Sequence, residues 1–80
     1  MPSISHHHLY PVIVAPSPKG FILNPVDFEN LSVEADNIQY GLDCIKSGIA
    51  QTITSVYQPL PTPVSELALN AREFVLIIDI

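Results

Sequence analysis

The sequence predicts an α+β domain: a small, mainly antiparallel sheet with one helix packed on one face, in the order β-β-β-α-β. Three observations support this prediction. Short β-branched runs separated by turn residues fill the first part of the chain, an amphipathic helical pattern follows, and an apolar strand comes last. With 80 residues the chain has room for one domain. Residues 1–8 are a polar lead-in that we expect to be flexible, and residues 9–80 form the domain.

The first three strands are predicted from composition and turn chemistry. Leu9–Ala15 is rich in β-branched residues and predicts the first strand. The prolines and glycine of Pro16–Gly20 lead into a second strand, Phe21–Asn24, so we expect a hairpin with a long loop. Leu31–Glu34 alternates weakly and predicts a short third strand.

A helix is predicted over Asn37–Tyr57, because apolar residues recur there at helical spacing. The residues of this stripe are Ile38, Leu42, Ile45, Ile49, Ile53 and Val56. Asp36 is the expected N-cap, with Gln39 completing a capping box. Gly41 and Gly48 lie on a flank of small residues, and each costs a helix about 1 kcal/mol relative to alanine. Either another backbone approaches this flank closely, or the glycines are simply tolerated.

The last strand is predicted at Phe74–Ile80, after an extended connector that begins with the alternating prolines of Pro59–Pro63. It is apolar on both faces, which is typical of a central strand covered on both sides. A right-handed crossover from the helix would make it parallel to a neighbour, the first strand being the plausible one. One helix covers one face, so we expect Val75 and Ile77 to lie against another copy in a homo-oligomer, a dimer or a tetramer.

Composition excludes several classes of function. The formal net charge is −5 and there are only 3 lysines and arginines, so no basic patch is available to neutralise phosphates and no direct nucleic-acid binding is expected. The apolar runs are much shorter than the roughly 18 to 20 residues that span a bilayer, so no membrane association is expected. A single cysteine and the lack of a signal-peptide pattern predict a cytoplasmic location.

Few residues suggest catalysis or metal binding. His6–His8 would place two imidazoles on one side of an extended segment, whereas zinc needs three or four ligands; a solvated tail or tag remnant is the other interpretation. Cys44 would need an activating base to act as a nucleophile. The alternative is that it is a small buried side chain that only fills space.

The chain's aspartates are Asp27, Asp36, Asp43 and Asp79. They are scattered over different predicted elements, so we expect no catalytic residue, metal or cofactor, and no enzyme.

Tyr40 is predicted on the polar face of the helix. An exposed aromatic residue there is a common interface anchor, although scattered exposed aromatics are also normal. The sequence leaves both interpretations open.

The order of motifs resembles the HicB family of antitoxins. The similar features are an aromatic-proline pair opening the first strand, a glycine-aromatic pair opening the second, acidic loop positions before the helix, a proline-rich connector and a closing apolar strand. The matching segments are Tyr10–Val14, Gly20–Phe21, Asp27–Phe28 with Asp36, Pro59–Leu67 and Phe74–Asp79. The resemblance covers roughly residues 9–80.

This resemblance implies a partial ribonuclease-H-like fold without catalytic carboxylates, assembly through the sheet, and steric neutralisation of a small, basic HicA-type toxin that cleaves mRNA. The C-terminal DNA-binding domain of many relatives is not expected here. We expect Asp27, Tyr40 and the Gly41/Gly48 flank to contact the partner. The alternatives are a diverged, orphan self-associating structural module without a toxin, and a residual Mg²⁺-dependent nuclease using Asp27, Asp36 or Asp79.

Overall fold

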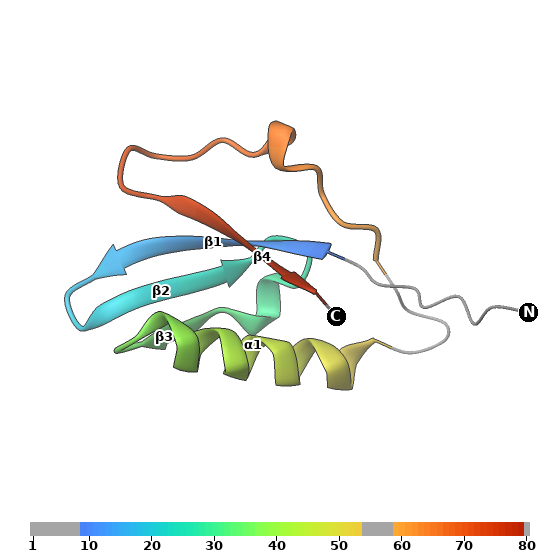
Figure 1. Ribbon diagram of the computed structural model, residues 1–80, viewed down its shortest axis with the longest axis horizontal. Helices are drawn as coiled ribbons and strands as arrows, with labels where there is room; N and C mark the ends of the chain where they lie inside the picture. Colours follow the sequence, from blue (N-terminus) through green and yellow to red (C-terminus); the bar gives the residue numbers. More distant parts are fainter. Residues whose placement is uncertain (1–8, 54–58, 80) are drawn as a thin grey trace, which may run out of the picture.

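A computed structural model describes residues 9–53 and 59–79. Within these residues the chain forms one four-stranded sheet and one α-helix (Figure 1). The elements are β1 (Leu9–Ser17), β2 (Gly20–Pro25), the 3₁₀ turn η1 (Glu29–Leu31), β3 (Val33–Ala35), α1 (Ile38–Thr52), the 3₁₀ turn η2 (Val64–Glu66) and β4 (Phe74–Asp79). The strands lie in the order β3-β2-β1-β4, and each neighbouring pair is antiparallel. The predicted α+β class, with an antiparallel sheet and one helix, is confirmed.

The hairpin of β1 and β2 closes more tightly than the sequence suggested. Pro16 stays in the ladder opposite Phe21, so the expected long loop is reduced to a two-residue turn between Ser17 and Gly20. Gly20 makes this turn possible, because its φ of 148° is a conformation that L side chains rarely adopt. It also lies against the end of β3, because a Cβ added at position 20 would collide with the backbone carbonyl of Ala35.

The direction of β4 corrects the prediction. β4 pairs antiparallel with β1, with Val12 opposite Leu76, and it lies at the edge of the sheet. Both the expected parallel pairing and the expected central position are therefore wrong. Figure 1 shows the reason: α1 ends near the start of β1, and segment 59–73 then runs back along the side of the strands away from α1. The chain thus enters β4 from the opposite end of the sheet.

Segment 59–73, which we call the connector, is bound to the rest of the chain at its start and ends in a hydrogen-bonded turn. At its start, the hydroxyl of Tyr10 donates a hydrogen bond of 2.7 Å to the carbonyl of Pro59. The carboxylate of Asp27 accepts two bonds from Thr62, 3.0 Å from its backbone N–H and 2.7 Å from its hydroxyl. At its end, the N–H of Glu73 donates to the carbonyl of Asn70 over 3.0 Å and closes the turn into β4.

The core lies between the sheet and α1. Its buried residues come from β1, β2, β4, α1 and the loop after β2: Tyr10, Val12, Val14, Leu23, Phe28, Ile45, Ile49 and Ile78. Tyr10 packs edge-on against Phe28, with ring centroids 4.9 Å apart, so an aromatic pair closes one end of the core. Each fully buried aliphatic side chain contributes roughly 1.5–3 kcal/mol through removal from water.

The helix begins one residue later than predicted. Asn37, not Asp36, is the N-cap, and its side-chain oxygen accepts a 2.7 Å bond from the N–H of Tyr40. Gln39 makes no capping box; its amide donates to Asp43 over 3.0 Å. The last helical residue is Thr52, and Ile53 is already extended. Positions 54–57 of the predicted helix lie outside the described residues.

The small-residue flank of α1 packs on the chain's own side chains. A Cβ added to the buried Gly41 would lie 2.7 Å from Leu23 Cδ1, and one added to Gly48 would lie 3.3 Å from Leu31 Cδ1. Within the described residues these glycines thus accommodate leucine side chains, and their expected contact with a partner stays a prediction.

These two glycines should respond differently to alanine. Alanine favours the helix by about 1 kcal/mol at either site. At position 41 this gain is outweighed, because Leu23 is fully buried and cannot move away, and overpacking costs about 1–3 kcal/mol. Urea unfolding should show Gly41→Ala destabilised and Gly48→Ala, where the half-buried Leu31 can shift, unchanged or stabilised. Equal effects of the two substitutions would contradict this packing.

Candidate functional site

The titratable residues of the described part do not assemble into a metal or catalytic cluster. Among these residues no group of three or more His, Cys, Asp or Glu side chains could hold a metal ion. Asp36, Asp43 and Asp79 are exposed and Cys44 is half-buried. His6–His8 lie outside the described residues.

Asp27 lies just after β2 and is used within the chain. Both of its carboxylate oxygens accept hydrogen bonds from Thr62, which is 35 residues further along the sequence. The side chain therefore holds the connector against the sheet. Its expected contact with a partner stays a prediction.

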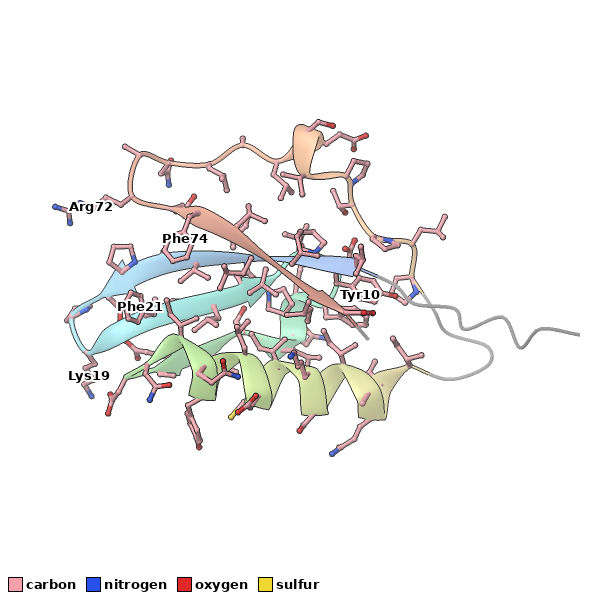
Figure 2. The ribbon with its side chains drawn as sticks, viewed as in Figure 1. Tyr10, Lys19, Phe21, Arg72 and Phe74 are labelled. Atoms are coloured by element: carbon pink, nitrogen blue, oxygen red, sulfur yellow. The ribbon has the colours of Figure 1, made fainter. Side chains whose placement is uncertain are left out.

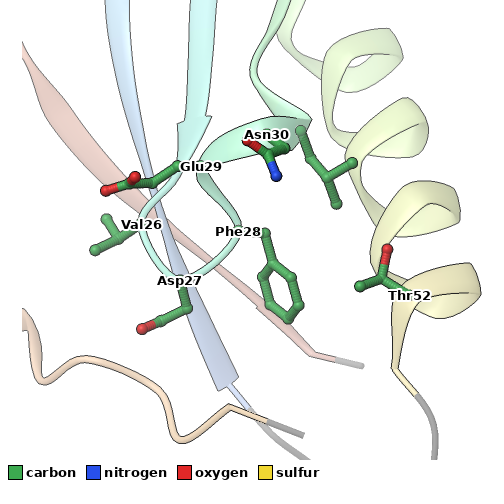
Figure 3. Close-up of a pocket in the computed structure, with 7 residues that line it drawn as sticks. Val26, Asp27, Phe28, Glu29, Asn30 and Thr52 are labelled. Carbon is green, nitrogen blue, oxygen red and sulfur yellow. The ribbon is translucent and has the colours of Figure 1, made fainter. Parts of the chain in front are cut away.

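A pocket of about 410 Å³ lies between the loop after β2 and the end of α1 (Figure 3). It is lined by Val26, Asp27, Phe28, Glu29, Asn30, Leu31 and Thr52. Two of its polar groups are engaged within the chain: Asp27 binds Thr62, and the hydroxyl of Thr52 donates to the carbonyl of Gly48 over 2.8 Å. Glu29 and Asn30 are exposed at its rim. This lining contains few convergent polar groups of the kind that fix the orientation of a small-molecule ligand.

Tyr40 lies in the first turn of α1, and its side chain is 61% exposed. Its hydrogen bond with Cys44, one helical turn later, and the nearby charge of that thiol when ionised hold the pKa of Tyr40 above its ordinary value of 10.0. The phenol is therefore neutral at physiological pH. The side chain is exposed, and its contact with a partner stays a prediction. Gly41 and Gly48, the other predicted contact residues of this helix, lie against leucine side chains of the same chain.

The outer face of the sheet, which we define as the face away from α1, is apolar across three strands. The strand register places Ile22, Ile13 and Val75 on this face, since Ala15 pairs with Ile22 and Ile13 pairs with Val75. Ile22 is 41% exposed and Ile77, on the same face of β4, is 46% exposed. Pro11, directly opposite Ile77, is fully buried, so the chain covers part of this face itself.

β4 adds an open edge to this face. The strand order gives β4 one neighbour, β1. Among the described residues, the backbone-to-backbone hydrogen bonds of the connector link connector residues to one another. No charged residue interrupts the sequence from Phe74 to Ile78. An exposed apolar edge of this kind is a template for pairing with another strand, and natural proteins usually protect it with charges, prolines or bulges.

The structure brings some of the predicted contact residues together and separates others. Val75 and Ile77 lie on the outer face beside the open edge, as a binding surface requires. Tyr40 lies on α1, Asp27 lies in a loop, and Gly41 is buried. Sequence reasoning missed Ile22, because its membership of the same surface follows only from the register of β2 on β1.

Comparisons with protein-family models, with curated proteins and with solved structures gave no significant match to this chain. In the part of the chain that the structure describes, no helix is both long enough and apolar enough to span a membrane.

The role of Asp27 can be tested through stability. Asp27→Asn replaces one acceptor with an amide that faces the Thr62 donors, so we expect a loss of about 1–3 kcal/mol. For a domain of this size each kcal/mol corresponds to a fall in Tm of about 4–8 °C. Asp43→Asn is the matched control, because this aspartate is exposed and accepts only a surface bond from Gln39. If Asp27→Asn is as mild as the control, the connector is not held by this contact.

Proposed function

We propose that the chain is a non-enzymatic protein-binding module whose binding surface is the edge of β4 with the adjoining outer face. The observation that supports this most is β4 itself: a six-residue strand at the edge of the sheet, without a charge before Asp79 and with Ile77 46% exposed. Such edges bind extended strands through backbone hydrogen bonds, and apolar side chains beside them add affinity.

For the partner, we propose a small basic ribonuclease of the HicA type, which the chain would neutralise as a HicB-like antitoxin by covering the ribonuclease's active site. The order of the sequence motifs and the net charge of −5 support this choice, since an acidic surface complements a protein that binds RNA. The element order supports the resemblance as well, whereas the antiparallel direction of β4 departs from it. Such a partner places the proposed site of action in the cytoplasm.

The alternative is a self-associating structural module without a toxin partner. The open edge of β4 favours this reading too, because an edge that can accept a foreign strand can also accept its own copy. The two proposals differ in whether a second kind of protein is bound and inhibited.

The test is capture of the ribonuclease by the purified chain, followed by an mRNA-cleavage assay. Wild-type protein should retain a small basic ribonuclease from host extract and stop its cleavage at stoichiometric amounts. Ile77→Lys should weaken this binding at least tenfold, because it places a charge at the centre of the apolar surface. Val64→Lys, at a 50% exposed position on η2, is the matched control and should bind normally. Cleavage that continues at excess wild-type protein would contradict the antitoxin proposal.

A further inference from the structure

We propose that the start of the connector, Pro59–Val64, is a polyproline II segment that is recognised by a protein domain with a groove lined by aromatic side chains. This surface is made of other residues than the edge of β4, so the inference goes beyond the proposed function and does not rest on it. Three observations on the described residues support it: the conformation of the segment, the side chains that it exposes, and the contacts that hold it.

The first observation is the conformation that the prolines impose. Pro59, Pro61 and Pro63 fix φ at about −65° at every second position, and the residue before a proline is restricted to extended or polyproline II angles. At Pro63 φ is −62° and ψ is 138°, close to the polyproline II values of about −75° and +145°. Residues 59–63 belong to neither a helix nor a strand. The segment therefore has a polyproline II shape before any partner binds.

The second observation is which side chains face outward. A polyproline II helix has about three residues per turn, so Leu60 and Pro63 share one ridge, and Pro59 and Thr62 share another. Leu60 is 81% exposed, the highest value among the large hydrophobic residues that the structure describes, and Pro63 is exposed as well. Pro59 and Thr62 are half-buried. The ridge of Leu60 and Pro63, which we call the outer ridge, is thus an apolar strip in contact with solvent.

The third observation is how the other ridge is held. The hydroxyl of Tyr10 donates to the carbonyl of Pro59 over 2.7 Å, and Figure 2 shows Tyr10 at the end of the sheet where the connector starts. The carboxylate of Asp27 accepts two hydrogen bonds from Thr62. Both contacts involve residues of the half-buried ridge and leave the outer ridge uncovered. Because the segment is already ordered, a partner that binds it removes little further conformational freedom.

These features fit one kind of partner. Grooves lined by aromatic side chains bind proline-rich polyproline II segments, as in SH3, WW and EVH1 domains, because flat rings pack well against proline rings and the apolar side chains between them. Glu66 is the one charged residue in sequence positions 59–71, so the recognition would be mainly apolar. A spacer that only stiffened the connector would have no need of an exposed leucine on its outer ridge.

A panel of purified SH3, WW and EVH1 domains, added to the whole isotope-labelled chain, tests the inference by NMR spectroscopy. At least one domain should bind at micromolar concentration and shift the amide signals of Leu60, Thr62 and Val64 more than those of β4. Binding by no domain of the panel, or shifts centred on β4, would overturn the inference.

A pair of leucines tests the location of the binding site. Leu60→Ala should weaken binding of the domain at least about tenfold, because it removes the apolar side chain that the groove would bury. Leu69→Ala is the matched control, since this leucine lies in the same connector and is 40% exposed but follows the proline run. It should change the dissociation constant by no more than about twofold. Equal effects of the two substitutions would overturn the inference, provided that circular dichroism shows both variants folded.

Asp27→Asn tests whether the held conformation is the one that is bound. At a temperature well below the Tm of the variant, it should weaken binding about threefold, because the loosened segment then has more freedom to lose. Asp43→Asn should bind as the wild type does. Unchanged or tighter binding by Asp27→Asn would contradict the inference, since the domain would then recognise a released segment and not the ordered one.

Discussion

The arrangement of this protein depends on how the connector is held to the sheet. Tyr10 and Asp27 bind the connector at Pro59 and Thr62, close to where α1 ends. From there the connector runs along the strands, on the side away from α1, before β4 begins (Figure 1). β4 consequently enters from the far end, pairs antiparallel with β1 and becomes the edge of the sheet. The surface that we propose for binding follows from this one constraint.

Local features of the fold could be predicted from the sequence, and long-range ones could not. The β-branched run of β1 and the stripe of isoleucines on α1 are local patterns, and both elements form where these patterns lie. The sequence predicts the N-cap one residue too early, because aspartate and asparagine are equally good caps. β3 ends at Ala35, and the helix then begins after Asn37 and not after Asp36. The direction of β4 depends on contacts between residues 35 and 49 positions apart, which no local pattern contains.

The same distinction applies to the candidate site. The sequence indicates Val75 and Ile77, because a strand that is apolar on both faces needs cover on both. Ile22 joins them only through the register of two ladders, and Gly41 was expected on a surface but fills the space beneath Leu23. Asp27, expected to contact a partner, has an intramolecular role that becomes visible only when Thr62 is brought next to it. The apolar residues of the strands thus contribute both to the core and to the outer face beside the edge of β4.

Hydrogen exchange of the β4 amides at two protein concentrations tests the central claim, that β4 is an open edge used for binding, most directly. In dilute protein, the amides of β4 that point toward β1 should be protected and those that point away should exchange quickly. At high concentration, or with a bound partner, both sets should be protected, because backbone pairing slows exchange. Protection of every β4 amide at all concentrations would contradict the account, since it would mean that the edge is already covered within one chain.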